Sequence, residues 1–265
     1  MEREIYPHAP VVLVTVEARH PEAPLLSPGE QSEMKRLVAS SFALPQPLQN
    51  MRLKATAGAP ASMEQEFVPR FATRDQTTAV MFGAQAVVVE TTRHQTFERI
   101  LELVRISIDA RQKVAPVDGL MRLGLRYINE IRVPDVCHGA IGWAEWVNGS
   151  LLGAVTVGEP LGLTAEQSQG ATVFNRGSGL QVAVQYGTRQ GFAVMPGGPL
   201  QRPTPPPGPF FLIDIDSFWS ATDEVPEFNT EAILALCSDL HEPVSRLFES
   251  LITDKLREEV LRNVQ

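Results

Sequence analysis

Cysteine is scarce in this sequence. The two cysteines among 265 residues, Cys137 and Cys237, are far apart and form no CxxC pair. This usage excludes a framework of disulfides and favours two buried or half-buried thiols in a reducing compartment. His138 follows Cys137 directly, but adjacent side chains on a strand or turn point apart, so we assign Cys137 no catalytic role.

Positive charge and long apolar runs are also lacking. The chain has 23 Lys and Arg against 31 Asp and Glu, which gives a formal net charge of −8. An acidic surface repels polyanions, so nucleic acid is not an expected partner. The aliphatic run Val11–Val14 is far shorter than the roughly 20 residues of a membrane span, and no basic stretch precedes a signal-like segment. We therefore expect a cytoplasmic protein with no membrane partner.

The familiar catalytic motifs are missing as well. The sequence has no GxSxG nucleophile turn, no GxxxxGK[ST] phosphate loop and no GxGxxG at a strand–helix junction. Its five histidines are scattered and form no HxH or HxxxH pair that could bring two imidazoles to one metal. We predict no catalytic residue, no metal site and no cofactor.

The first part of the chain alternates between strand and helix patterns. Ser27, Pro28 and Glu30 have the spacing of a capping box with proline at the first helical position, so a helix starts there. Elsewhere the apolar residues repeat every second position or at helical spacing. The predicted elements are a strand at 11–19, a helix from Pro28 to near Phe42, three strands of a meander at 51–55, 67–71 and 79–90, and a helix at 94–114.

The second part repeats this order of elements. A Gly-rich turn at 176–179 predicts a hairpin, the proline-rich loop 195–209 excludes helix and central strand, and Pro243 should kink or divide the last helix. The predicted elements are a strand at 120–133, a short helical segment around Trp143 and Trp146, strands at 168–176, 179–188 and 210–219, and a helix at 230–263.

These patterns predict an α+β fold of two similar halves, residues 1–116 and 117–265. Each half would form an antiparallel sheet with helices packed on one face. The second half would carry the proline-rich loop 195–209 and end in the long C-terminal helix 230–263.

Four segments carry a resemblance to a known family. They are PHAPVVLVTVEAR at 7–19, LGLRYINEI at 123–131, FLIDIDSFW at 211–219 and LHEPVSRLFESLITDKLRE at 240–258. Together they resemble an uncharacterised, sporadically distributed bacterial protein family of similar length. The resemblance implies a fold and a bacterial cytosolic setting, with no activity, cofactor or catalytic residue attached. Sporadic distribution is typical of accessory genes, including those of defence and toxin–antitoxin loci.

Two predicted strands each carry charged residues on one face. These are the candidate ligand-binding residues Arg122, Arg126, Glu130, Asp214 and Asp216. If the two strands share a sheet, they form a cross-strand ladder or a polar pocket for an anionic or polar ligand; a solvated sheet face is the simpler alternative. Asp214 and Asp216 also have the spacing of a carboxylate pair, but a metal needs further ligands.

The last predicted helix carries a long apolar stripe. Its candidate oligomer-interface residues are Leu240, Val244, Leu247, Phe248 and Leu251. The stripe either packs on the chain's own sheet or exceeds what one sheet covers and joins a homo-oligomer.

From these features we predict a protein-interaction module rather than an enzyme. Its partner would be another protein or a second copy of itself, and a neighbouring gene product is the natural candidate. Two alternatives remain open: an enzyme or small-ligand receptor with an Arg/Asp-lined pocket, and a holdase-like chaperone that binds unfolded chains.

Overall fold

The computed structural model describes residues 6–54, 62–93, 96–134 and 139–263, so Cys137 and His138 lie outside the described residues. The strands are β1 (Val11–Arg19), β2 (Leu44–Pro45), β3 (Leu48–Lys54), β4 (Ser62–Val68), β5 (Arg70–Ala72), β6 (Thr78–Phe82), β7 (Ala86–Thr91), β8 (Arg122–Ile131), β9 (Gln169–Gly177), β10 (Leu180–Gly191) and β11 (Gly208–Ser220). The helices are α1 (Pro28–Val38), α2 (Phe97–Val114), α3 (Ala154–Gly158), α4 (Thr230–Leu251) and α5 (Asp254–Leu256), with short 3-10 turns at Ile141–Glu145, Gly149–Leu151 and Glu159–Leu161 and a π-turn at Arg257–Leu261.

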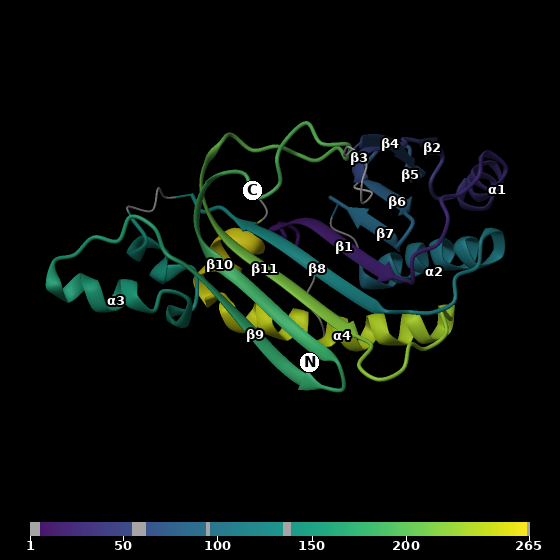
Figure 1. Ribbon diagram of the computed structural model, residues 1–265. Coiled ribbons are helices and arrows are strands. Elements are labelled where there is room, and N and C mark those ends of the chain that lie inside the picture. The colour runs from purple at the N-terminus through teal and green to yellow at the C-terminus, as the bar shows by residue number, and fades with distance from the viewer. Residues whose placement is uncertain (1–5, 55–61, 94–95, 135–138, 264–265) are drawn as a thin grey trace.

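One large antiparallel sheet organises these elements (Figure 1). Its strand order is β2-β5-β6-β7-β1-β8-β11-β10-β9, and β3 and β4 form a separate two-stranded sheet. The central pair is β1 and β8, with Val16 opposite Leu125 and Arg19 opposite Arg122. The predicted α+β fold with antiparallel strands and a C-terminal helix is therefore confirmed, but strands of residues 1–116 and 117–265 share one sheet where the sequence predicted a separate sheet for each half.

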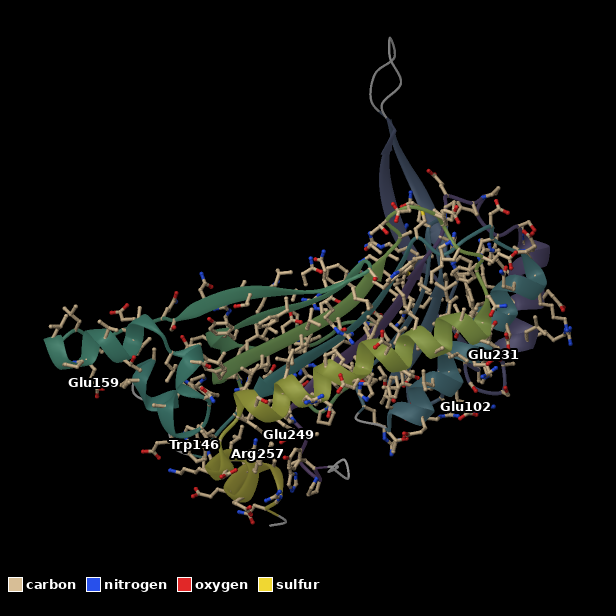
Figure 2. All side chains as sticks on the ribbon, turned by 90° about the horizontal axis from the view of Figure 1, so that it is seen from below. Glu102, Trp146, Glu159, Glu231, Glu249 and Arg257 are labelled. Atoms are coloured by element: carbon tan, nitrogen blue, oxygen red, sulfur yellow. The ribbon has the colours of Figure 1, made fainter. Side chains whose placement is uncertain are left out.

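The two faces of the sheet differ because side chains alternate along each strand. Val16, Leu125 and Ile215 point to one face and are buried, and α2 and α4 belong to that side. Arg126 and Asp216, their neighbours in sequence, point to the other face. Figure 2 shows α4 along one side of the sheet, with the β3–β4 ribbon rising on the opposite side.

Two apolar clusters make up the core. The larger one joins Val16 of β1, Leu103 of α2, Leu125 of β8 and Leu240 of α4. The smaller one lies at the other end of the sheet, where residues such as Trp143 pack against β10, β11 and the C-terminal turns. Because the larger cluster contains residues from both 1–116 and 117–265, the predicted boundary runs through a shared core.

Local signals set several element boundaries as predicted. The Ser27 hydroxyl accepts from the Glu30 backbone N–H, and the Glu30 carboxylate accepts from the Ser27 backbone N–H, which completes the capping box of α1. Between β9 and β10, Ser178 and Gly179 have φ of 50° and 80°. Two consecutive positive φ values make the tight turn that suits the twist of a hairpin.

The strands between α1 and α2 differ from the prediction. Of the predicted strand 51–55, residues 51–54 belong to β3, which pairs with β4 outside the main sheet, and residue 55 lies outside the described residues. The segment 67–71 spans the end of β4 and the start of β5. The run 79–90 is two strands, β6 and β7, joined by a turn in which the Gly83 N–H donates to the Ala86 carbonyl. Both strands are largely buried, so their apolar pattern continues through the reversal and hides it.

Pro243 lies inside α4 and does not divide it. A proline cannot donate to the carbonyl four residues earlier, here that of Asp239. That carbonyl instead accepts from Arg176 Nη1 at 3.3 Å, while Arg176 Nη2 pairs with the Asp239 carboxylate at 3.0 Å. The predicted helix 230–263 is divided at Ile252, where an extended residue bridges to Val147.

The apolar stripe of α4 is covered largely by the chain itself. Leu240 and Val244 are buried, and Leu247, Phe248 and Leu251 are half-buried and pack against the smaller cluster. Leu240 and Val244 therefore lie in the chain's own core and expose almost no surface to a second subunit, because they pack among the residues of the two apolar clusters. His241 is also buried, stacked on Phe97 with ring centroids 3.7 Å apart.

We predict that Leu240→Ala lowers the free energy of unfolding by about 3 kcal/mol, because it removes buried methyl groups and leaves a cavity. Urea unfolding followed by tryptophan fluorescence measures this loss. The matched control is Leu163→Ala at a leucine that is 65% exposed, which should change stability by at most about 0.5 kcal/mol. A loss that grows on dilution would instead identify Leu240 as an interface residue.

Candidate functional site

Four of the predicted polar residues meet on the helix-free face of the sheet. Arg126 of β8 binds Asp214 of β11 through both ends of its guanidinium, with Nε–Oδ1 at 2.8 Å and Nη2–Oδ2 at 2.5 Å. The side chain of Asp214 is only 6% exposed, whereas that of Arg126 is 46% exposed. This two-point geometry is the strongest form of an arginine–carboxylate pair and fixes both side chains.

Arg122 makes the second link of this ladder. Its Nη2 lies 3.0 Å from Asp216 on β11, and its Nη1 lies 3.0 Å from Glu17 on β1. The guanidinium also covers the ring of Phe218, with 4.5 Å between its central carbon and the ring centroid. A Cβ at Gly124 would lie 2.5 Å from Arg122 Nη1. Glycine at this position is what lets the arginine lie flat along the sheet.

Glu130 stands apart from the ladder and holds the proline-rich loop. Its buried carboxylate accepts from Arg132 Nε at 2.8 Å and from the backbone N–H of Ala193 at 2.7 Å. Arg202 of the loop is buried with its Nη1 3.9 Å from the same carboxylate. Residues 192–207 form no helix or strand, and these contacts tie them to β8. The predicted loop 195–209 is wrong at its end, because Gly208 and Pro209 begin β11 and pair with Gly191 and Gln190 of β10.

Burial shapes the electrostatics of the ladder. Desolvation raises the pKa of Asp216, although Arg122 and Arg126 act in the opposite direction. The hydrogen bond to Asp214 raises the pKa of Arg126. Every guanidinium and carboxylate of the ladder has an oppositely charged partner, and Glu17 also pairs with Arg19 at 2.7 Å. The arrangement therefore acts as a cross-strand ladder that neutralises its own charge.

Glu17 is the member of the ladder that sequence reasoning missed. On β1 it alternates with the buried Val16 and Ala18. An acid between two apolar residues of a strand points to the opposite, polar face of the sheet, and this pattern could have identified Glu17. In the part of the chain described here, no cluster of three or more His, Cys, Asp or Glu side chains could hold a metal ion.

The two edges of the sheet are unlike. The β2 edge has two residues and contains Pro45, which has no N–H to offer. The β9 edge has nine residues and no proline or lysine. Val173 is 62% exposed and Phe174 is 44% exposed, on opposite faces of the strand. A long edge with exposed apolar side chains and a single charged residue, Arg176, is a template for pairing with another strand.

The chain matches no protein-family model and none of the curated proteins with which it was compared. The family resemblance of its four segments therefore stays a prediction. No helix within residues 6–54, 62–93, 96–134 and 139–263 combines the length and the apolar character that a membrane span requires.

The raised pKa of Asp216 predicts a pH dependence of stability. The folded chain holds this proton more tightly than the unfolded chain does, so the stabilisation is complete below the unfolded pKa of about 4. It is lost as pH rises through the raised folded value. We expect the unfolding free energy of wild type minus that of Asp216→Asn to be largest at acidic pH. The difference should decrease as pH rises and then stay constant.

Urea unfolding of both proteins at a series of pH values from acid to neutral measures this difference. The matched control is Asp223→Asn at an exposed aspartate outside the ladder. A wild-type advantage over Asp216→Asn that stays constant across the series contradicts the assignment.

Proposed function

We propose that the protein is a protein-interaction module and that its interaction element is the edge of β9. The observation that carries the proposal is the contrast between the two edges of the sheet. The β2 edge is closed by its two-residue length and by Pro45. The β9 edge leaves a row of backbone N–H and C=O groups on its outer side, together with two exposed apolar side chains. Addition of a strand there would satisfy the backbone and cover the side chains.

We propose a second copy of the chain as the occupant of this edge. Val173 is the middle residue of β9, so an antiparallel two-fold pairing centred there matches the strand along its whole length. It places Val173 against Val173 of the partner subunit and keeps the apolar residues in the middle of the interface. The single charged residue of β9, Arg176, is paired with Asp239, so two copies meet without like-charge repulsion.

Two other candidate functions have less support. A small-ligand receptor or enzyme built on the Arg/Asp residues is weakened because those charges already bind each other across the sheet. A holdase-like chaperone would need a broad exposed apolar surface, and α4 packs its stripe against the chain's own core. The proposal retains two expectations from the sequence: a cytoplasmic location and a role accessory to a neighbouring gene product.

Introduction of a negative or a positive charge at Val173 tests the proposal. Wild type should sediment as a dimer of 29.1 kDa chains at micromolar concentration. Val173→Glu should be monomeric, because two carboxylates then face each other across the two-fold axis. Val173→Lys should also be monomeric, and an equimolar mixture of the two variants should recover the dimer. Analytical ultracentrifugation measures all four samples.

The matched control is Leu25→Glu, which adds the same charge at a leucine that is 45% exposed and lies between β1 and α1, far from β9 in the sequence, and it should leave the dimer intact. Monomeric wild type contradicts self-pairing at β9. So does a dimer that survives both substitutions at Val173.

We also infer that residues 1–116 and 117–265 follow one plan. Outward from the central β1–β8 pair, the strand order is β7, β6, β5 and the two-residue β2 on one side and β11, β10, β9 on the other. In residues 1–116 the last strand, β7, lies beside β1 and leads into the long helix α2. In residues 117–265 the last strand, β11, lies beside β8 and leads into the long helix α4. This equivalence in strand order is what supports the proposal.

The equivalence predicts that the two parts can exchange their order along the chain. Described residues near the two ends are close, since the His8 N–H donates to the Leu261 carbonyl at 3.1 Å. A circular permutant that starts at Val117, with a short Gly/Ser linker between the old ends, should keep the circular dichroism spectrum and melt within about 5 °C of wild type. A permutant opened inside β8 at Arg126 is the control that should fail to fold. Failure of the first permutant contradicts the shared plan.

A further inference from the structure

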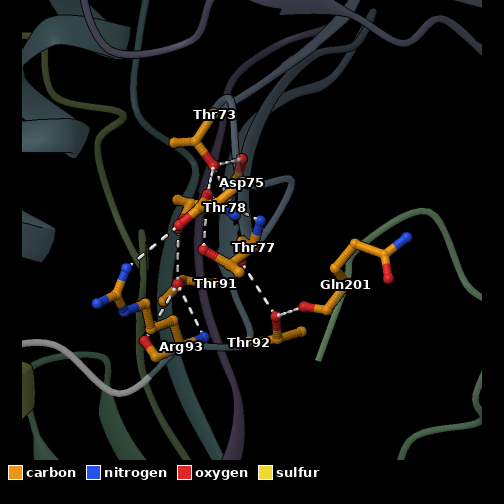
Figure 3. A network of polar contacts seen from close by, with 8 residues as sticks. All are labelled: Thr73, Asp75, Thr77, Thr78, Thr91, Thr92, Arg93 and Gln201. Atoms are coloured by element: carbon orange, nitrogen blue, oxygen red, sulfur yellow. Dashed lines mark hydrogen bonds and ion pairs between the residues drawn. The ribbon is translucent and has the colours of Figure 1, made fainter. Parts of the chain in front are cut away.

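A surface hollow of about 640 Å³ lies between the turn that joins β5 to β6 and the first turn of α2. Its lining is formed by hydroxyl-bearing and charged side chains: Thr73, Arg74, Asp75, Thr77, Thr78, Arg93, Thr96 and Arg99. Figure 3 shows the polar network beneath it, in which the threonines of the β5–β6 turn and of β7 surround Asp75 and Arg93. No residue of the Arg122–Asp216 ladder takes part.

Asp75 organises one wall of the hollow. Its Oδ1 accepts from the Thr73 hydroxyl at 2.6 Å and from the Thr77 hydroxyl at 3.0 Å. Its Oδ2 lies 3.3 Å from Arg93 Nη1. These hydrogen bonds lower the pKa of Asp75, with the Thr73 hydroxyl as the largest cause. The carboxylate therefore stays ionised and positions Arg93 by a single long contact, which leaves the other guanidinium nitrogens for a ligand.

The backbone that carries Arg93 is also held in place. The Thr91 hydroxyl lies 2.8 Å from the Thr78 hydroxyl, accepts from the Arg93 N–H at 3.3 Å and donates to the Arg93 carbonyl at 3.2 Å. Thr92 donates to the carbonyl of Gln201 in the proline-rich loop at 2.5 Å. The backbone at Arg93 is thus held in place, which reduces the conformational entropy lost when a ligand binds.

The hollow is positively charged although the chain is acidic. Three arginines and one aspartate line it, whereas the whole chain has a formal charge of −8. Within the described residues, Arg74 makes no ion pair, and Arg99 pairs with Glu102 of its own helix. The N-terminus of α2, capped by Thr96, adds its partial positive charge. An excess of fixed cations on an acidic protein points to an anionic ligand.

We propose that this hollow binds the phosphate group of a small phosphate monoester. Guanidinium groups bind phosphate oxygens at two points, and threonine hydroxyls add neutral donors around them. The volume lies within the roughly 300–1,000 Å³ of small-molecule sites, so it has room for the organic part of an ester beside its phosphate. Free inorganic phosphate shares the same chemistry, and the experiment separates the two.

The test is isothermal titration calorimetry of the full chain with glycerol phosphate and, separately, with inorganic phosphate at constant ionic strength. We expect saturable binding of one phosphate group per chain. Arg93→Gln and Arg74→Gln should each weaken it about tenfold, the effect of losing one charge-assisted contact. Arg93→Lys should fall between wild type and Arg93→Gln, because it keeps the charge and loses the two-point geometry.

The matched control is Arg246→Gln, which removes the same charge from an exposed arginine on α4. It should bind as wild type does, and circular dichroism establishes that each variant is folded. Tighter binding of glycerol phosphate than of phosphate shows that the organic part contacts the hollow, and equal affinity makes inorganic phosphate the ligand. Absence of saturable binding at millimolar concentration overturns the proposal, as does equal weakening by Arg246→Gln and Arg93→Gln.

Discussion

The pairing of β1 with β8 is the constraint on which the rest of the molecule depends. The two strands are distant in sequence, yet they lie side by side at the centre of the sheet, with Val16 opposite Leu125. Because of this pairing, strands of residues 1–116 extend the sheet in one direction and strands of residues 117–265 in the other. Both long helices then cover one continuous apolar face, and Leu103 and Leu240 meet in a single core.

The helices cover only one face of the sheet, so the charged side chains on the other face must find partners within that face. Charged side chains on an uncovered sheet are stable when they pair laterally, and the strand order brings Glu17, Arg122, Arg126, Asp214 and Asp216 within reach of one another. The hollow beside α2 is different. There three arginines and one aspartate line the surface, and this surplus of positive charge is the basis of the proposed phosphate site.

The proposed dimer edge and the proposed phosphate site lie on different parts of the sheet. β9 is the outer strand on one side, and β5 and β6, which carry the hollow, are on the opposite side of the central pair. Self-pairing through β9 would therefore leave both hollows of a dimer accessible, one toward each outer end. Association and ligand binding can be tested separately, because Val173 and Arg93 share no contact described above.

The sequence by itself determined what depends on near neighbours: the strand Val11–Arg19, the Ser27 capping box, the β9–β10 turn and the extended proline-rich loop. It also placed the charged residues of β8 and β11 on matching faces, since alternation is a local property. Apart from the β9–β10 hairpin, only the tertiary structure decided which strands are neighbours. That decision added Glu17 to the ladder, removed Glu130 from it, covered Leu240, exposed the β9 edge and gathered the arginines of the hollow. Each of these depends on contacts between residues far apart in the chain, which local patterns do not encode.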